Sequence, residues 1–464
     1  MQRPLGLAVF LSLGVAGCAT GPDYKAPLSA DLGVPASYAG RQAAPLAEAE
    51  LANWWTRFGD PALNALVEQA VAANLDIAQA EARLRQAREA SVQAGAGLLP
   101  SLGASAGGGR NFNSSSGDNN SFSLGLDASW QADLFGGTRR GVEAARADEA
   151  ASRYSLASVR VAIVAEVVTN YIQLRLAQEQ LRIAGANVGH QRENRNIAGW
   201  RVQAGLVSSL DEQQARVQLA QTEASIPAIE GNLAGALNRL AVLTGQAPGA
   251  ATQALEAPAP IPEPPAGISA GIPADTLRQR PDVLGAERSL AAATARIGVA
   301  EAQLLPSLGI SGNIGTSALR PGGLFDIVTG ALFASLGQTI FDGGARRSQM
   351  RSQQAAVDGA FASYRQTVLG ALEDVENALV AGQAAERRTG QFAEAADAAN
   401  NSALLARLQY QSGLTDFQTL LTAEQSLLSA SNSLAGSRAE EALAVVQLYN
   451  ALGGGWQTMD GSGR

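Results

Sequence analysis

Few residues in this 464-residue chain have side chains that could carry out covalent or metal chemistry. Cys18 is the only cysteine and His190 is the only histidine, so the chain cannot form an internal disulfide. His190 lies in a long helical pattern without a cysteine or carboxylate set at metal-ligand spacing, and we interpret it as a surface or seam residue. Phosphate-binding loops and nucleophile motifs are absent from the sequence. We therefore predict no catalytic residue, no metal site and no cofactor.

The thiol of Cys18 is the one group for which the sequence predicts a covalent modification. Residues 1–17 carry Arg3 ahead of the apolar run Leu5–Val15, which is typical of an export signal peptide. The small residues before Cys18 resemble a bacterial lipobox, which implies removal of residues 1–17 and attachment of lipid, such as palmitate, to Cys18. Ala19, rather than an aspartate, follows the cysteine and resembles the outer-membrane sorting pattern. The alternative is an unmodified cysteine in an ordinary signal.

The rest of the chain is organised around a segment that occurs twice. Residues 99–140 and 305–347 both begin with Leu-Pro-Ser-Leu and end with Arg-Arg. The two copies are offset by about two hundred residues, which indicates an internal duplication. We expect a first structural repeat over 61–247 and a second over 273–452.

Each copy contains a predicted β-hairpin, at about 100–135 and about 306–341. Residues 122–134 alternate apolar and polar side chains with a period of two. This stretch exceeds an ordinary strand and reaches the roughly nine to eleven residues that a tilted strand needs to cross a bilayer. We expect Asp127, Gln131 and Asp133 to face a water-filled lumen, and Phe122, Leu126 and Trp130 to face lipid.

Four strands per chain cannot close a barrel, and lipid does not tolerate an open sheet edge. Closure would require several copies of the chain. Two copies would give eight strands, whose interior side chains nearly fill the barrel, and three would give twelve strands around a lumen. The alternative is a small β-domain in a soluble protein.

Long helices are predicted after each hairpin, at about 138–204 and about 345–411. These segments lack proline, and their small or apolar residues recur at alternating steps of three and four, the pattern of a heptad seam. At 1.5 Å per residue each helix would be roughly 100 Å long. Gly205 and Gly413 follow the two segments and are suited to helix C-caps. We expect a shorter helix to return after each turn, giving one antiparallel coiled coil per repeat.

The remaining segments have proline-rich or glycine-rich composition. We expect an N-terminal, lipid-anchored arm over 18–60, an extended connector over 248–272 and a flexible tail over 453–464. The net charge of −8 and the lack of a basic cluster argue against a nucleic-acid partner.

Short motifs are spread along the whole chain: Gly17-Cys18-Ala19, Trp54-Trp55, Phe58-Gly59-Asp60-Pro61, Arg280-Pro281-Asp282-Val283 and Ala451-Leu452-Gly453-Gly454-Gly455-Trp456. They resemble those of one family, the TolC-like outer-membrane factors of tripartite efflux systems, in its lipoprotein branch with OprM and NodT. The resemblance implies an α+β membrane protein. In it, a trimeric 12-stranded outer-membrane β-barrel continues into a long periplasmic α-helical barrel. It also implies a periplasmic adaptor and an inner-membrane, proton-driven pump as partners.

The resemblance places the pore gate at the periplasmic tip, near the turns after the long helices. The residues at the matching positions are Tyr410, Gln411, Asp416, Gln418, Thr422 and Asp211. Relatives commonly carry charged residues where this chain has Gln411, Thr419 and Thr422, so we expect a polar gate, with Asp416 or Asp211 as an acidic member, rather than a charged one. Asp416 and Asp211 are alternatively helix caps or solvated tip residues. The turns themselves, at Gly205, Leu206, Gly413 and Leu414, are the expected adaptor-docking sites.

The function that these patterns predict is passive conduction. The chain would be the outer-membrane exit duct of a tripartite efflux pump, conducting small molecules such as drugs while the pump supplies the energy. Two alternatives stay open at this point, the outer-membrane duct of a protein-secretion system and a structural periplasmic coiled-coil lipoprotein.

Overall fold

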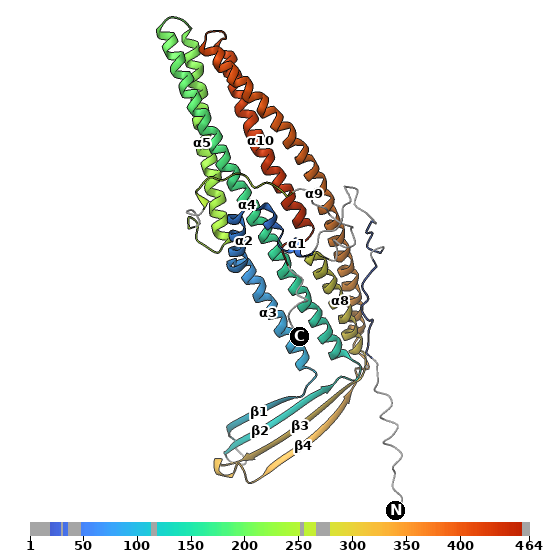
Figure 1. The fold of residues 1–464 in the computed structure, drawn as a ribbon. Helices are drawn as coiled ribbons and strands as arrows, with labels where there is room; N and C mark the ends of the chain where they lie inside the picture. The colour runs from blue at the N-terminus through green and yellow to red at the C-terminus, as the bar shows by residue number, and fades with distance from the viewer. Residues whose placement is uncertain are drawn as a thin grey trace, which may run out of the picture. The chain divides into compact units, whose positions relative to one another are not determined.

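The structure is a computed structural model that describes residues 19–28, 31–35, 48–112, 118–250, 255–265 and 279–456. The predicted signal peptide over 1–17 and the predicted lipidation site Cys18 lie outside these residues. In chain order the elements are α1 (Glu48–Ala52), η1 (Trp54–Phe58), α2 (Pro61–Ala73), α3 (Leu75–Ala96), β1 (Ser101–Asn111), β2 (Asn119–Ala132), α4 (Gly137–Gln203), α5 (Ser209–Leu243), α8 (Pro281–Ala302), β3 (Ser307–Ala318), η2 (Pro321–Gly323), β4 (Val328–Gly337), α9 (Ala345–Gln411) and α10 (Phe417–Ala451) (Figure 1).

The chain divides into two compact units. The first unit combines the strands with residues 82–100 and 284–306 and with the starts of α4 and α9. The second unit contains the remaining parts of α4 and α9 together with α1, α2, α5 and α10.

In the first unit, four antiparallel strands form one sheet in the order β1-β2-β3-β4 (Figure 1). The pairing of β2 with β3 joins the two repeats into this sheet. Leu126 of β2 lies opposite Ala104 of β1 and opposite Ile314 of β3. Since directly opposed residues share a face of an antiparallel pair, apolar side chains are aligned in rows across one face.

The two faces of the sheet differ in polarity. The face that carries Leu126 also carries Leu102, Phe122, Leu124, Trp130, Leu308, Ile310, Ile314, Leu332 and Leu336. The opposite face carries Ser101, Ser105, Ser121, Ser123, Asp127, Ser129, Gln131, Ser311, Asn313, Ser317 and Ser335. A sheet with one apolar and one polar face is typical of the wall of a membrane barrel around a polar interior.

Asp133 does not belong to the polar face of β2, which corrects our expectation of a lumen-facing strand residue. The strand ends at Ala132, and the carboxylate of Asp133 accepts hydrogen bonds from the backbone N–H groups of Thr138 (3.1 Å) and Arg139 (2.9 Å). These groups belong to the first turn of α4, where N–H groups have no intrahelical acceptor. Burial raises the pKa of Asp133, but the hydrogen bonds from Arg139 and Thr138 outweigh burial and keep the pKa below its ordinary value. Asp133 is therefore a helix-capping residue.

Exposed aromatic rings stand near both ends of the sheet. Phe112 follows β1 and Phe325 precedes β4 at one end, and both rings are largely exposed. At the other end, Trp130 lies two residues before the end of β2, and the exposed Phe341 lies between β4 and α9. Aromatic belts of this kind occur at the two boundaries of membrane-spanning barrels.

The long helices α4 and α9 each contain 67 residues. In the second unit their buried residues recur with helical spacing, as in the series Val164, Val168, Tyr171 of α4 and the pair Val368, Val375 of α9. By length and composition α4 could cross a membrane, but half of its most apolar window is buried inside the protein. We therefore interpret α4 as a core helix of the helical unit.

The flexible tail does not begin at Gly453, contrary to our expectation. Gly453 and Gly454 are buried, the Gly455 N–H donates to the Leu51 carbonyl (2.9 Å), and the Trp456 indole donates to the Gln279 carbonyl (3.1 Å). Glycine is required here because a Cβ atom at Gly454 would lie 2.9 Å from the Trp54 ring. Residues 457–464 lie outside the described part of the chain.

Substituting alanine for Gly454 is expected to destabilise the helical unit. The added methyl group would press on Trp54, a fully buried ring that stacks on Tyr449 with ring centroids 4.9 Å apart. Overpacking of this kind typically costs about 1–3 kcal/mol. Thermal unfolding followed by circular dichroism should show a lower midpoint for Gly454→Ala. Gly436→Ala is the matched control, because a Cβ atom at Gly436 would meet open space; equal midpoints for the two variants would contradict the packing described for Gly454.

Candidate functional site

The two long helices end in turns with the same geometry, and Figure 1 shows both turns at the same end of the helical unit. Gly205 (φ 68°) and Gly413 (φ 73°) adopt the left-handed conformation that favours glycine. The N–H of Leu206 donates to the Arg201 carbonyl (2.9 Å), and the N–H of Leu414 donates to the Gln409 carbonyl (2.8 Å). These bonds close a Schellman motif at each helix end and leave both leucine side chains largely exposed. We call these two turns, Gly205–Leu206 and Gly413–Leu414, the tip turns.

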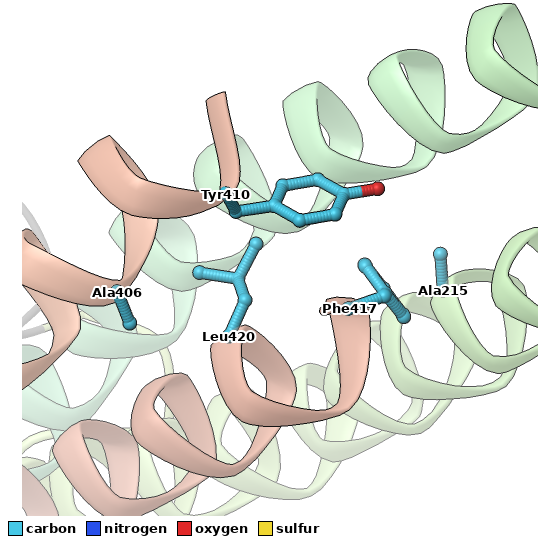
Figure 2. Close-up of a cluster of buried hydrophobic side chains, with 5 residues drawn as sticks. All are labelled: Ala215, Ala406, Tyr410, Phe417 and Leu420. Carbon is cyan, nitrogen blue, oxygen red and sulfur yellow. The ribbon is translucent and has the colours of Figure 1, made fainter. Parts of the chain in front are cut away.

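Tyr410 lies in the packed interior of the tip. Its ring contacts Phe417 edge to face, with ring centroids 5.6 Å apart. Figure 2 shows the two rings together with Leu420, Ala406 and Ala215. These five side chains form one hydrophobic cluster, to which α9, α10 and α5 all contribute. Burial raises the pKa of the Tyr410 hydroxyl above its ordinary value. In the single chain Tyr410 therefore stabilises the tip through packing.

Arg201 connects the ends of the two long helices. Its Nη2 atom donates to the Tyr410 carbonyl (2.7 Å), and its guanidinium carbon lies 4.4 Å from the centre of the Tyr410 ring. A guanidinium over an aromatic face is attracted by the ring quadrupole in addition to the hydrogen bond. This contact joins the end of α4 in the first repeat to the end of α9 in the second.

The two tip carboxylates are placed at helix starts. Asp416 is the N-cap of α10, where its side chain accepts a hydrogen bond from the Thr419 N–H (2.7 Å). Hydrogen bonds from the Thr419 side chain and backbone hold the pKa of Asp416 below its ordinary value. Asp211 lies half-buried in the first turn of α5, beside the N-cap Ser208. Asp416 thus has the capping role that the sequence left open.

The other predicted gate residues are exposed. Gln411 ends α9, and Gln418 and Thr422 lie near the start of α10. The Thr422 hydroxyl donates to the Gln418 carbonyl within the helix (2.9 Å). Their polar surface is free for contacts beyond the single chain.

Local sequence patterns did not predict a buried polar network that lies near the tip. Glu424 of α10, only 5 % exposed, accepts hydrogen bonds from Asn194 of α4 (2.7 Å) and from Arg407 of α9 (3.3 Å). Buried carboxylates are rare unless they are paired. Glu424 follows the buried Phe417 and Leu420 at helical spacing, so a carboxylate on an apolar helix face was the available signal. The network connects the two repeats near the tip, and each of its residues lies more than one helical turn from the nearest tip turn along its helix.

A second polar cluster lies in the first unit, where the strands meet the helices. Arg140 of α4 donates to the backbone carbonyls of Thr20 (3.0 Å) and Gly21 (3.3 Å) and forms ion pairs with Asp23 (2.6 Å) and Glu143 (2.7 Å). Its side chain is buried, and the hydrogen bond to Asp23 raises the pKa of the guanidinium further. We call Arg140 with residues 19–23 the arm clamp.

The arm clamp also contains a close backbone contact. The Thr20 hydroxyl donates to the carbonyls of Phe135 and Gly298, each at 3.0 Å. A Cβ atom at Gly298 would lie 2.5 Å from the Thr20 carbonyl oxygen. The backbone at Thr20 is therefore held against the junction of β2 with α4 and against Gly298 near the end of α8.

An amphipathic sheet of long strands joined to two 67-residue helices defines the class of outer-membrane channels that extend into the periplasm. The comparisons with known proteins agree with this class and narrow it. A profile of the outer membrane efflux protein family matches residues 66–246 and again 272–454, so the chain belongs to that family. The double match agrees with the duplication.

Individual relatives are similar over nearly their whole length. Nodulation protein T of Rhizobium leguminosarum bv. trifolii is 32 % identical over 463 residues, covering 98 % of both chains. Pyoverdine export outer membrane protein OpmQ of Pseudomonas aeruginosa is 31 % identical over 467 residues, covering 97 % of this chain and 96 % of the relative.

Solved structures are also similar over nearly the whole chain. The outer-membrane channel OprN has 34 % sequence identity and a TM-score of 0.85, with 95 % of this chain and 100 % of that chain covered. The open state of the MtrE outer membrane channel of Neisseria gonorrhoeae has 26 % identity and a TM-score of 0.86, with 95 % and 99 % covered. The protein is thus an outer-membrane efflux channel that extends into the periplasm, and it provides the exit duct of a tripartite efflux system.

Proposed function

We propose that three copies of this chain enclose one continuous, water-filled duct through which small molecules pass without catalysis. The observation that carries this proposal is the four-stranded sheet with one apolar face, one polar face and two edge strands, β1 and β4. An open edge is not tolerated in lipid, so copies must pair edge to edge. Two copies would give eight strands, a barrel that side chains fill, whereas three would give twelve strands around a lumen.

The native mass of the detergent-extracted protein tests this stoichiometry. We expect a mass of three chains after subtraction of bound detergent and lipid. A stable, folded species of one or two chains would contradict the proposal, because it would leave too few strands for an open barrel.

Accessibility of the strands tests which face lines the lumen. Cysteines introduced at Asp127 and Gln131 on the polar face are expected to react with a membrane-impermeant maleimide, whereas cysteines at Leu124 and Leu126 on the apolar face are expected to stay unlabelled. Wild-type protein, whose one cysteine is Cys18, gives the background. Preferential labelling at 124 and 126 would place the apolar face toward water and refute the assignment.

The membrane anchor is the second part of the proposal. The arm clamp holds Thr20 beside Phe135, just beyond the end of β2, so a lipid on Cys18 would start close to the membrane boundary. We infer that residues 1–17 are removed and that Cys18 is lipidated. Mass spectrometry of the mature N-terminal peptide is expected to show the lipid mass; an unmodified Cys18 would exclude the anchor.

The tip turns are the proposed docking site for a periplasmic adaptor, which would connect the duct to an inner-membrane, proton-driven pump. The exposed side chains of Leu206 and Leu414 support this role, since an adaptor could bury them. Relatives named for pyoverdine export and for antibiotic or toluene efflux support small molecules as the cargo.

The gate is proposed to lie at the tip and to be polar, formed by Gln411, Gln418 and Thr422 of the three copies. Asp416 would then act as a helix cap. Because asparagine caps a helix about as well as aspartate, Asp416→Asn should leave the conductance of the resting channel at the wild-type level, whereas Asp416→Ala should raise it by fraying the start of α10. If both variants instead leaked equally, and more than the wild type, in bilayer recordings, the charge of Asp416 would have a gating role.

A further inference from the structure

One strand residue breaks the polarity of its face. Phe333 of β4 lies opposite Ser311 of β3, which places it on the polar face of the sheet. Among the strand residues that the structure describes, it is the one large apolar side chain on that face, where the others are Ser, Thr, Gly, Ala, Asn, Asp or Gln. The ring is 59 % exposed in the single chain. An exposed ring on an edge strand is a candidate for burial by a neighbouring strand.

The opposite edge of the sheet has the complementary feature. On its polar face β1 carries three glycines, Gly103, Gly107 and Gly109. On this face Ser105 lies between the first two glycines, and Asn111 follows the third. Glycine in a strand leaves backbone uncovered, and an aromatic ring on the adjacent strand can cover it. The two edge strands have similar lengths, 11 residues in β1 and 10 in β4.

The duplication predicts how these two edges meet. Ser101 pairs with Ser129 in the first hairpin and Ser307 pairs with Gly337 in the second, so β1 corresponds to β3 and β2 corresponds to β4. The pairing of β2 with β3 inside the chain is therefore the template for pairing β4 with β1 of the next copy.

Aligning the two hairpins on their pairs Ser101–Ser129 and Ser307–Gly337, rather than on the sequence offset, gives a definite register. Counting from the matched pairs, Phe333 of β4 corresponds to Gly125 of β2, and Gly109 of β1 corresponds to Gly315 of β3. Gly125 and Gly315 lie directly opposite each other. Phe333 of one copy should thus lie opposite Gly109 of the next, with Ser335 opposite Gly107.

We propose that Phe333 packs across Gly109 of a second copy and sets the register in which β4 and β1 close the barrel. The inference rests on the proposed assembly of several copies and adds the contact that aligns them. A slip of one residue would turn the polar side chains of one strand toward lipid, so a contact that specifies the register stabilises the closed barrel. The glycine is required because a larger side chain at 109 would occupy the space of the ring.

Cross-linking between copies tests the register. Each variant carries one cysteine in place of Ser335 and a second in place of Ser105, Gly107 or Gly109, with Cys18 retained. The three pairs differ by steps of two residues and so keep the same face and the same hydrogen-bonding class. After oxidation we expect the Ser335→Cys/Gly107→Cys pair to give the largest fraction of interchain dimers and trimers on denaturing gels. Stronger cross-linking of the pair with 105 or 109 would overturn the proposed register.

The role of the ring is tested by thermal dissociation of the purified oligomer. Phe333→Ala is expected to lower the dissociation midpoint by several degrees, while Phe325→Ala, which removes a still more exposed ring outside the strands, should leave it unchanged. Equal midpoints for the two variants would overturn the proposal, as would a change in conductance without any change in the midpoint. If the wild-type protein formed no oligomer, the proposed assembly itself would fail, so the two failures are distinguishable.

Discussion

Alanine in place of Glu424 is expected to loosen the periplasmic tip by about 3–5 kcal/mol, the usual cost of removing one partner from a buried charged group. The substitution leaves the Arg407 guanidinium and the Asn194 amide without their shared acceptor between α4, α9 and α10. Since the network joins the two repeats near the tip turns, its loss should increase local opening there. We expect faster hydrogen exchange in residues 190–203 and 404–425 and a higher resting conductance.

Two further variants make this prediction specific. Glu440→Ala removes a carboxylate of the same helix whose ion pair with Arg388 is exposed, and exposed pairs contribute little. Replacing Glu424, Arg407 and Asn194 together by apolar residues of similar size should restore much of the lost stability, because no buried polar group is then left unpaired. If Glu424→Ala and Glu440→Ala exchanged hydrogen at the same rate at the tip, the network would have no role in holding it closed.

Alanine in place of Arg140 is expected to release the N-terminal arm from the first unit. The ion pairs with Asp23 and Glu143 contribute little, since these carboxylates are 83 % and 45 % exposed. The main loss is the buried, charged hydrogen bonding to the Thr20 and Gly21 carbonyls, at about 1.5–3 kcal/mol for each bond to a charged group. Residues 19–28 should then exchange hydrogen rapidly and become accessible to proteases while the sheet stays folded.

The neighbouring arginine provides a matched control. Arg139 is about half-exposed and pairs with Asp133, so Arg139→Ala should leave the arm protected. Gly298→Ala should release the arm by a different route, because its Cβ would collide with the Thr20 carbonyl. Protection of residues 19–28 in both Arg140→Ala and Gly298→Ala would show that other contacts hold the arm.

The elements with strong periodicity were predictable from the sequence. The alternation in 122–134 predicted β2, and the proline-free seams predicted helices that begin and end within one or two residues of α4 and α9. Gly205 and Gly413 predicted the tip turns because glycine is the residue type that most readily adopts a positive φ.

Contacts between distant segments were not predictable from local patterns. Asp133 continues the alternation of β2, yet the free N–H groups of the next helix draw its carboxylate out of the strand pattern. The composition of residues 453–464 predicted a polar, flexible tail, but Gly454 and Gly455 pack against Trp54, which is distant in the sequence. The network around Glu424 joins residues up to 230 positions apart. Such partners become visible only when the helices are placed side by side.

If several copies enclose a water-filled lumen, ions must pass through it, so current through a planar lipid bilayer reports directly on the duct. The purified wild-type oligomer should produce discrete, reproducible conductance steps, with larger or more frequent openings in Glu424→Ala. Absence of any current from oligomer that has inserted into the bilayer, in the Glu424→Ala protein as well as in the wild type, would contradict a continuous duct.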